Sequence, residues 1–389
     1  MDNSVLSRGS RPRNRRALIV AAAGDLFARR GYARVGMSEI AEAVAIGPSA
    51  LYRHFSGKQD LLREVITEGL VPIRDTLSAP GLRGRAALRG LAAIGVEHRP
   101  LGVLWQREAR HLADDDRARL RRELREIGAL AAGHVRLARP GLDDGAAALL
   151  AWSVIAVAAS VSFHRVDLSR VPAADLLAGL IDAVLDTGLP DPGERAPSPP
   201  AVGMLPASRR EALLIEAVRM FAERGYTGVA IEDIGAAVGI AGPSVYNHFP
   251  AKLDVLTTAC RRGIGLLYMD LTAAYTAASA APDALRALIR SYTRFTRVHP
   301  DFVTLLISEI GHLPEEERHS VRRAQYDYVS EWVHLLGLTR RDIDPIAARI
   351  RVHAALSVPN DAARTPRLRR GRGTPAALER VAAGILGIA

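Results

Sequence analysis

Several residue types are scarce in this 389-residue sequence. Cys260 is the only cysteine, which excludes an intrachain disulfide and any metal site built from several thiolates, and indicates a reducing compartment such as the cytoplasm. Acidic side chains are outnumbered, 42 against 52 basic ones, and the net charge of +10 favours a polyanionic partner. Neither half shows a nucleophile motif, a Gly-rich phosphate loop or a clustered ligand set, so we predict no enzyme, no cofactor and no metal site.

Long hydrophobic runs are also rare. The first 16 residues are polar and basic, which does not fit a signal peptide. The best candidate for a membrane span is residues 146–163, a stretch of eighteen residues without charge, but a core or interface helix has the same composition. The matching segment of the second half contains Arg349, Arg351 and His353, so we predict a buried helix and no membrane contact.

An internal repeat organises the chain. A shift of 194 residues aligns residues 27–62 with residues 221–256 without a gap, and 16 of the 36 pairs are identical. Lysine occurs twice in the whole sequence, and both copies, Lys58 and Lys252, fall on the same position of the repeat. Because a second lysine placed at random would rarely land there, we predict that this position needs an ammonium group.

A weaker repeat follows at a shift of 201, where Glu108 and His111 face Glu309 and His312. The chain is therefore predicted to hold two units of about 190 residues, too long a period for a solenoid. A Pro-rich segment that should be semi-extended joins them. We predict a short N-terminal domain in each unit (12–58 and 208–252), a longer domain behind it (59–188 and 253–389) and a linker at 189–207.

Both units are predicted to be helical nearly throughout, so the fold class is all-α. Apolar residues at a 3.6-residue spacing predict a first helix of about 14 residues that ends at Gly31 or Gly225. A short helix over 37–44, a turn at 45–47 and a third helix from Pro48 to Phe55 follow, and the second unit repeats the pattern. Two short helices joined by a tight turn are typical of the helix-turn-helix motif. A longer helix is expected after each lysine.

The third helix of each unit carries the residues that could read DNA. Leu51 and Phe55 share one face, which we assign to the core, so the other face near the helix N-terminus can enter the major groove. Arg53 suits a bidentate contact with guanine, whereas Asn247 at the matching position suits adenine. The residues so assigned to base edges are Ser49, Ala50 and Arg53, with Pro243, Ser244 and Asn247 in the second unit.

Other polar residues around this helix suit the phosphate backbone, because a phenol hydroxyl or a compact ammonium can position a protein without reading sequence. Packing is the alternative for the tyrosines, and capping or packing for the histidines. The basic arm from Arg8 to Arg16 either reaches along DNA or is a solvated tail. The residues assigned to phosphate are Tyr52, His54, Lys58, Tyr246, His248 and Lys252.

The stretches GYARVGMSEIAEAVAIGPSALYRHFSGKQDLL and GYTGVAIEDIGAAVGIAGPSVYNHFPAKLDVL each resemble the DNA-binding domain of TetR-family transcriptional regulators. The resemblance implies three N-terminal helices, a fourth linking helix, and an all-helical domain that binds a small effector and dimerises through its last two helices. It supports the phosphate role of the tyrosines and lysines. The resemblance also assigns Pro48 and Gly242 to base edges.

The sequence departs from the family pattern at a few positions. Val35 and Val229 stand where the family usually has a threonine, which puts a cap and a phosphate contact from that hydroxyl in doubt. Ala45 replaces the glycine of the turn in the first unit only. The chain otherwise looks like a tandem TetR regulator, two units of a family that ordinarily works as a homodimer.

The tandem arrangement implies that the two units pair within one chain, although a further homodimer stays open. Residues 146–163 and 345–356 would then form a pseudo-twofold seam, with 172–185 and 375–388 beside them. Unlike reading helices on a fused pair predict an asymmetric operator in double-stranded DNA. We predict a cytoplasmic, ligand-responsive transcriptional repressor. The alternatives are a DNA-organising protein without effector and an enzyme with an appended DNA-binding domain.

The sequence indicates the effector site much less clearly. Leucines and aromatic residues of the longer domains suit either a pocket for a small hydrophobic effector or plain core. Glu108 and His111 recur as Glu309 and His312, a spacing seen in carboxylate metal sites, but one pair per unit supplies too few ligands, and we prefer surface or hinge contacts. The arginines at 364–372 suggest a solvated loop. The pocket candidates are Leu104, Trp105, Leu305, Leu306 and Tyr326.

Overall fold

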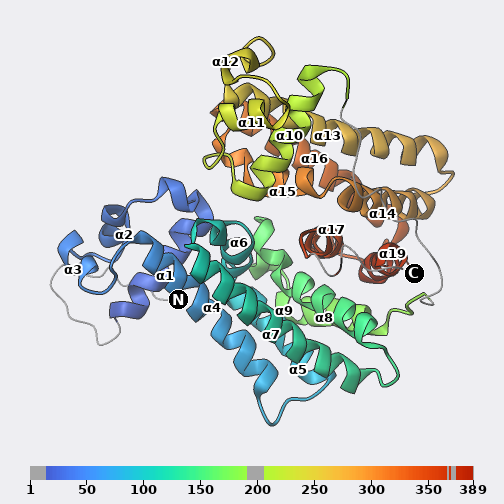
Figure 1. Cartoon of the computed structure of the whole chain (residues 1–389). Coiled ribbons are helices and arrows are strands. Elements are labelled where there is room, and N and C mark those ends of the chain that lie inside the picture. Colours follow the sequence, from blue (N-terminus) through green and yellow to red (C-terminus); the bar gives the residue numbers. More distant parts are fainter. Residues whose placement is uncertain (1–14, 191–205, 366–367, 369–373, 389) are drawn as a thin grey trace.

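The computed structural model describes residues 15–190, 206–365, 368 and 374–388, and every regular element in these ranges is a helix. The all-α prediction is therefore confirmed. Figure 1 shows the second unit at the top and the first unit below and to the left, with α8, α9, α17 and α19 between them. The linker core and most of the predicted basic arm lie outside the described residues.

The first unit begins with a three-helix domain and continues with a larger helical domain. The elements of the three-helix domain are α1 (Arg15–Arg30), η1 (Tyr32–Arg34), α2 (Met37–Ala43) and α3 (Pro48–Tyr52). Those of the larger domain are α4 (Lys58–Ser78), α5 (Arg85–Glu97), α6 (Leu101–Gln106), η2 (Glu108–His111), α7 (Asp114–Ala138), α8 (Asp144–Ala159), η3 (Ser160–Phe163), η4 (Leu168–Arg170) and α9 (Ala173–Asp186).

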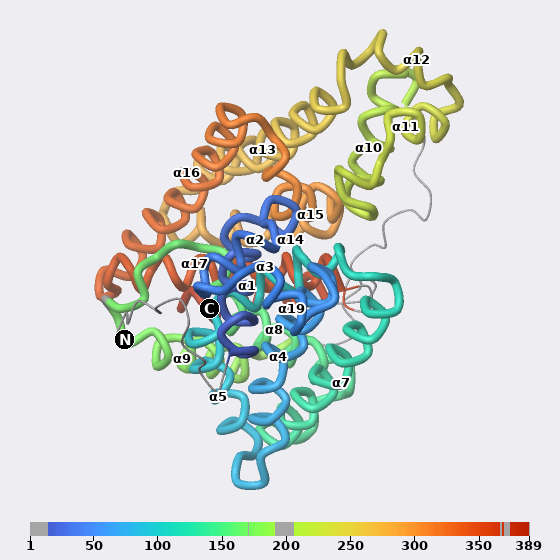
Figure 2. Tube along the Cα trace, turned by 90° about the vertical axis from the view of Figure 1, so that its left-hand side faces the viewer, coloured from blue at the N-terminus to red at the C-terminus, as the bar shows by residue number. Residues whose placement is uncertain are grey.

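The second unit repeats this order. Its elements are α10 (Arg209–Arg224), α11 (Ile231–Ala237), α12 (Gly242–Val245), α13 (Lys252–Ala277), α14 (Ala281–Val298), α15 (Pro300–Ser308), η5 (Ile310–His312), α16 (Glu315–Thr339), α17 (Pro345–Arg364) and α19 (Thr374–Leu386). Figure 2 shows α10, α11 and α12 gathered at the N-terminal end of α13. The long helices expected after Lys58 and Lys252 are thus confirmed as α4 and α13.

Positive-φ residues end the first helix and shape the turn of each helix-turn-helix. The chain leaves α1 and α10 at Gly31 (φ 85°) and Gly225 (φ 75°), where the absence of a Cβ avoids a steric penalty. In the turn after the second helix, Gly239 has φ 74°, and Ala45 occupies the matching position with φ 54°. Among the described residues, Ala45 is the one non-glycine with positive φ, so the substitution noted in the sequence is held in a strained conformation.

The third helix is shorter than the spacing predicts. We expected helix up to Phe55, whereas α3 ends at Tyr52 and Arg53 is its C-cap. The chain continues in a tighter turn, because the His54 amide bonds to the Leu51 carbonyl three residues back at 2.9 Å. This turn delivers Phe55 into the core, where it is 2% exposed.

The threonine positions of the family pattern are buried in this chain. Val35 and Val229 are 1% and 2% exposed, and the N-cap residues of α2 and α11 are Gly36 and Ala230, which carry no capping side chain. A carboxylate in the first turn compensates, because Glu39 accepts the Gly36 amide at 2.7 Å. The second helix of the motif is thus capped by a carboxylate from its own first turn.

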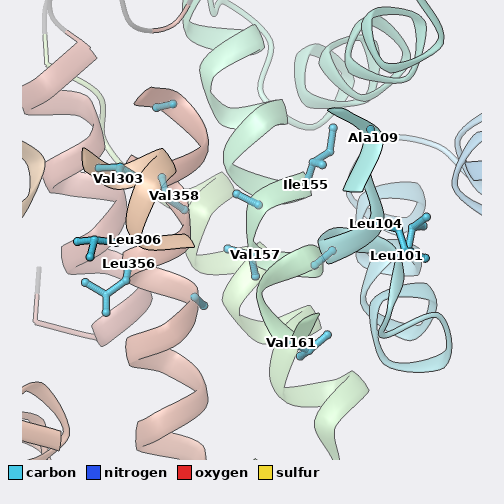
Figure 3. Close-up of a cluster of buried hydrophobic side chains, with 14 of the residues drawn as sticks. Leu101, Leu104, Ala109, Ile155, Val157, Val161, Val303, Leu306, Leu356 and Val358 are labelled. Atoms are coloured by element: carbon cyan, nitrogen blue, oxygen red, sulfur yellow. The ribbon is translucent and has the colours of Figure 1, made fainter. Parts of the chain in front are cut away.

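The helix α8, apolar after Asp144 in its first turn, lies between the two units. It packs against α7 and α9 of its own unit and against α17 of the other, while α9 meets α19. By length and composition Asp144–Phe163 is a candidate membrane span, yet 72% of its apolar window is buried. Figure 3 shows buried side chains continuing from α6 and η2, through α8 and η3, to α15 and α17. A protein interface therefore accounts for the apolar composition of α8.

Polar contacts also cross from one unit to the other. Gln106 at the end of α6 donates to Asp361 of α17 at 3.1 Å and accepts from Arg364 at 3.1 Å. Arg364 was expected in a solvated loop, and this is wrong, because α17 continues through it and directs it at the first unit. The other arginines of that predicted loop, from 367 onward, lie outside the described residues.

Candidate nucleic-acid interface

Each short third helix presents one face to solvent and buries the other. Leu51 and Val245 are fully buried, which fixes the orientation of α3 and α12 on the domain. Three of the first-unit residues assigned to base edges, Pro48, Ser49 and Arg53, are exposed, and Ala50 is partly covered. The first unit therefore brings a basic side chain and the N-terminus of α3 to one exposed face.

The second unit presents the same face with different chemistry. Pro243 and Asn247 are exposed, whereas Gly242 and Ser244 are partly covered. Where the first unit offers a five-donor guanidinium, the second offers an amide that both donates and accepts. The two faces thus suit different base edges, guanine for Arg53 and adenine for Asn247.

Two tyrosines stand out of the domain next to these faces. Tyr52 is 55% exposed and Tyr246 is 50% exposed, although both are large aromatic residues. Packing in the core, the alternative prediction from the sequence, therefore does not describe these two tyrosines. His54 is exposed as well, and His248 is partly buried, with its carbonyl accepting from Arg210 at 3.2 Å.

The basic residues that open each unit are partly engaged inside the protein. Arg16 forms an ion pair with Glu64 at 2.7 Å, and its guanidinium lies 5.1 Å from the centre of the Phe55 ring. The matching Arg210 lies 4.1 Å from the centre of the Phe249 ring. The end of the proposed arm therefore fastens the first helix to its domain, and residues 8–14 lie outside the described part of the chain.

The two lysines have a structural partner that the sequence did not reveal. Lys252 Nζ donates to the carbonyls of Tyr226 and Val229 at 2.9 and 2.8 Å and lies 4.2 Å from the Tyr226 ring centre. Lys58 lies at the same distance from the Tyr32 ring. Burial lowers the pKa of both lysines below the usual value for lysine. Each ammonium thus holds the turn after the first helix, and its contact with phosphate stays a prediction.

A buried carboxylate anchors each three-helix domain to the larger domain. The amide of Tyr32 donates to Glu108 at 2.9 Å, and the amide of Tyr226 donates to Glu309 at 2.9 Å. Both Glu108 and Glu309 are buried, so the alternative that they make surface contacts is wrong. The alternative of hinge contacts between the two domains of a unit describes them. The repeated Glu-x-x-His pattern was the sequence signal for this anchor.

The histidines of the same pattern complete the anchor. His111 stacks on the Tyr32 ring at 4.8 Å between centroids, and His312 stacks on Tyr226 at 5.2 Å. Burial, together with the charge of Arg110, lowers the pKa of both histidines to about 4. Both rings are therefore neutral at physiological pH. No group of three metal-ligating side chains is found in the described residues.

The pocket candidates separate into three groups. Trp105 lines an apolar cavity of the first unit, next to Leu101. Leu104, Leu305 and Leu306 are buried core residues at 5% exposure or less. The assignment of Tyr326 to a pocket is wrong, because its side chain is 60% exposed and lies beneath the guanidinium of Arg349 on the surface.

Fold and site together define a helical protein with two helix-turn-helix domains, each anchored to a larger helical domain. Comparison with known proteins identifies the family. Residues 19–65 and again 213–258 match the model of bacterial regulatory proteins of the tetR family, and residues 278–364 match that of a tetracyclin repressor-like C-terminal domain. The chain is thus a tandem member of the TetR family.

Individual relatives match parts of the chain. The HTH-type transcriptional repressor KstR2 of Rhodococcus jostii is 32% identical over 133 residues, which are 31% of this chain and 65% of that protein. The HTH-type transcriptional regulator BetI of Rhizobium meliloti is 32% identical over 104 residues, 27% of this chain and 51% of that protein. The chain therefore spans less than two thirds of the length of these relatives.

Solved structures match as well. A TetR-family transcriptional regulator from Bordetella parapertussis, known from its crystal structure, is 17% identical with a TM-score of 0.44. The match covers 46% of this chain and 95% of that one.

Proposed function

We propose that this chain is a sequence-specific transcriptional regulator that binds double-stranded operator DNA with both helix-turn-helix domains. The observation that carries the proposal is the pair of exposed reading faces, where Arg53 and Asn247 stand clear of the core. The net charge of +10 supports a polyanionic partner. Relatives described as repressors favour repression, and bacterial regulators of this kind work in the cytoplasm.

One chain would serve as a pseudo-dimer on one operator. The contacts of α8 with α17 and of α9 with α19 support this, because they join the larger domains of the two units through buried helices. A fused pair with unlike reading faces can recognise two unlike half-sites, about one helical turn or 34–36 Å apart. The proposed operator is therefore asymmetric.

Regulation would come from a small hydrophobic effector. The apolar cavity beside Trp105 supports an effector of this class. An effector that binds one conformation better than the other shifts the equilibrium by that difference in affinity. Binding in the larger domain would favour a spacing of the two reading helices that no longer fits the groove, and the operator would be released.

Selection of random-sequence DNA by the full-length protein tests the proposal. We expect one enriched site with two unlike half-sites, protected in footprints at physiological salt, and a complex whose mass corresponds to a single chain. A palindromic site bound by two chains would overturn the pseudo-dimer. Binding with steep salt dependence but without site preference would instead indicate the alternative, a DNA-organising protein that needs no effector.

A further inference from the structure

Five arginines from the two units gather where η1 of the first unit faces α16 of the second. Three come from η1, the C-cap of α6 and the segment after η3, and two from successive turns of α16. The charges of the other four all act on Arg322, which places this side chain at the centre of the group. The members of this arginine cluster are Arg34, Arg107, Arg165, Arg318 and Arg322.

Two members of the cluster have no partner in the described part of the chain. The guanidiniums of Arg165 and Arg322 form neither an ion pair nor a hydrogen bond with any residue there. Burial lowers the pKa of Arg322, and the four neighbouring guanidiniums lower it further. The cluster is therefore a concentration of like charge that the protein itself does not balance.

The buried carboxylates of this region are already engaged. Glu108 forms its ion pair with Arg107, and Glu309 forms one with Arg110, which reaches it from the first unit. Neither carboxylate pairs with Arg322. The positive charge at the centre of the cluster thus has to be offset from outside the described residues.

Main-chain carbonyls orient the other members of the cluster. Arg34 donates to the Gly311 carbonyl of the second unit, and Arg318 donates to the Leu313 carbonyl at 3.3 Å. Arg107 donates to a carbonyl in the last turn of α1 at 2.8 Å. A carbonyl fixes the direction of a guanidinium without cancelling its charge, so these side chains are held in place for an anion.

The cluster is open to solvent. Arg34, Arg165 and Arg322 are exposed. On the next turn of the same face of α16, Tyr326 is 60% exposed, and the guanidinium of Arg349 lies 4.6 Å from the centre of its ring. A basic surface therefore continues along α16, and a ligand can reach the cluster from solution.

The repeat does not build a second cluster. Gly228 and Ser308 of the second unit occupy the positions that match Arg34 and Arg107, so two of the first unit's arginines have no counterpart. Arg117, which matches Arg318, forms an ion pair with Asp114 of its own helix. Two identical subunits would form such a cluster twice, whereas this tandem chain forms it once.

We propose that the arginine cluster binds one small anion with more than one phosphate group, and that this anion fixes the first DNA-binding domain against α16 of the second unit. Guanidiniums bind phosphate oxygens through paired hydrogen bonds, and a multiply charged anion offsets several like charges at once. DNA is the other source of phosphate. The carbonyls that hold Arg34, Arg107 and Arg318 turn them toward the junction of the units, which favours the small anion. The inference goes beyond the proposed function, because the site needs no DNA.

Calorimetric titration of the full-length chain with pyrophosphate, without magnesium and at physiological salt, tests the site. We expect saturable binding of one pyrophosphate per chain. Arg322→Met and Arg165→Met should each weaken it about tenfold or more, the loss expected for hydrogen bonds between charged groups. Arg121→Met removes an exposed arginine at the position that matches Arg322 and should keep the wild-type affinity. Absence of binding, or an equal loss in Arg121→Met, would overturn the proposal.

Urea denaturation gives a second readout. Without the anion, Arg322→Met should be at least as stable as the wild type, because it relieves repulsion between like charges. Pyrophosphate should raise the urea midpoint of the wild type, since a ligand that binds the folded state stabilises it, and should leave that of Arg322→Met unchanged. An equal rise in both proteins would show a general salt effect and contradict the site.

Amide hydrogen exchange tests whether the anion fixes the first DNA-binding domain. We expect pyrophosphate to slow exchange several-fold at residues 32–36 of the wild type and of Arg121→Met, but not of Arg322→Met. Exchange that stays unchanged in the wild type while pyrophosphate binds would refute this part of the proposal.

Operator binding separates the two sources of phosphate. We expect Arg322→Met to leave the salt dependence of DNA affinity as in the wild type. If that dependence fell by about one counterion while pyrophosphate did not bind the free chain, the cluster would belong to the DNA backbone and the proposal would be wrong. Failure of the chain to select any DNA would instead count against the proposed function, because the other measurements involve no DNA.

Discussion

Single residues distinguish two units that are otherwise built alike. Arg53 and Asn247 occupy the same exposed position, so the two reading faces share a scaffold and differ in hydrogen-bonding chemistry. Ala45 and Gly239 occupy the same turn with positive φ, and only the glycine does so without a Cβ penalty. We expect the first difference to affect which bases each domain contacts and the second to affect the stability of each domain.

The first residue-scale prediction concerns base reading. Arg53→Ala should relax preference in one half-site alone, by about 1–3 kcal/mol at a guanine, because the bidentate contact is lost. Asn247→Ala should relax the other half-site by a similar amount at an adenine. Binding of the selected operator and of its single-base variants measures both effects. Equal losses in both half-sites for either variant would disprove the asymmetric operator.

The second residue-scale prediction concerns the strained turn at Ala45. Ala45→Gly should raise the free energy of unfolding by about 0.5–1 kcal/mol, because relief of a left-handed alanine, about 1–2 kcal/mol, exceeds the added entropy of the unfolded glycine. The reciprocal Gly239→Ala should lower it by about 1 kcal/mol. Urea denaturation of both variants measures the pair. A loss of stability in Ala45→Gly would show that the turn carries no strain.

At the scale of elements, the start of the fourth helix of each unit fastens the helix-turn-helix domain. Lys252 opens α13 and ties the turn between α10 and α11 with two hydrogen bonds, and Glu309 ties the same turn from η5. These polar contacts add to the packing of α1 on α4 and α6, and of α10 on α13 and α15, which joins each three-helix domain to its larger domain. This geometry explains the ammonium of Lys252, and Lys58 shares its contact with the tyrosine ring of that turn.

We predict unequal roles for the two lysines. Lys252→Met keeps the stem but removes two hydrogen bonds from a charged donor, and should lower the free energy of unfolding by about 2 kcal/mol. Lys58→Met removes a contact with an aromatic ring, worth about 0.5–1 kcal/mol, and should also lower the salt dependence of DNA affinity by about one counterion. Denaturation curves and salt titrations separate the effects; equal destabilisation by both variants would contradict this prediction.

At the scale of the whole molecule, two histidines meet across the seam. His164 at the end of η3 and His353 of α17 lie 4.6 Å apart between ring centroids, with Arg99 and Arg349 nearby. Burial lowers the pKa of His164 to about 2 and that of His353 to about 4, and the neighbouring charges add to the effect. The seam therefore packs neutral imidazoles, whereas an unfolded chain protonates them below pH 6.5.

Acid should therefore weaken the folded chain. Because the folded pKa of His353 lies below the unfolded one, its stability contribution is complete above pH 6.5 and is lost as the pH falls toward 4. One such histidine contributes a loss of about 2 kcal/mol between pH 7.5 and 5. His353→Gln should reduce the pH dependence by that amount, as measured by urea denaturation at both pH values.

Two features sharpen this experiment. Burial raises the pKa of Asp361 to about 6, which acts in the opposite direction, because a proton held more tightly in the folded state stabilises it in acid. The difference between His353→Gln and the wild type removes this common contribution. His319→Gln, at an exposed position, serves as the control and should leave the wild-type pH dependence intact. An unchanged profile in His353→Gln would refute the prediction.

The sequence by itself determined the repeat, the helical class and the helix-turn-helix motifs. These depend on local spacing: apolar residues every three or four positions make a helix face, and Gly31 or Gly225 ends it. The buried orientation of Leu51 and the exposure of Arg53 follow from the same periodicity. The ends of α3 and α12 were misplaced, since a tight turn and a helical turn share the same spacing.

The tertiary structure alone decided how distant residues meet. Glu108 anchors an amide 76 residues away and Glu309 one 83 residues away, and no local pattern reveals the partner. Tyr326 and Trp105 look alike as pocket candidates, yet one lies on the surface and the other on a cavity, because helix packing sets burial. The neighbours of Arg110 in the second unit depend on how α8 packs against α17, a long-range arrangement that spacing along the chain does not encode.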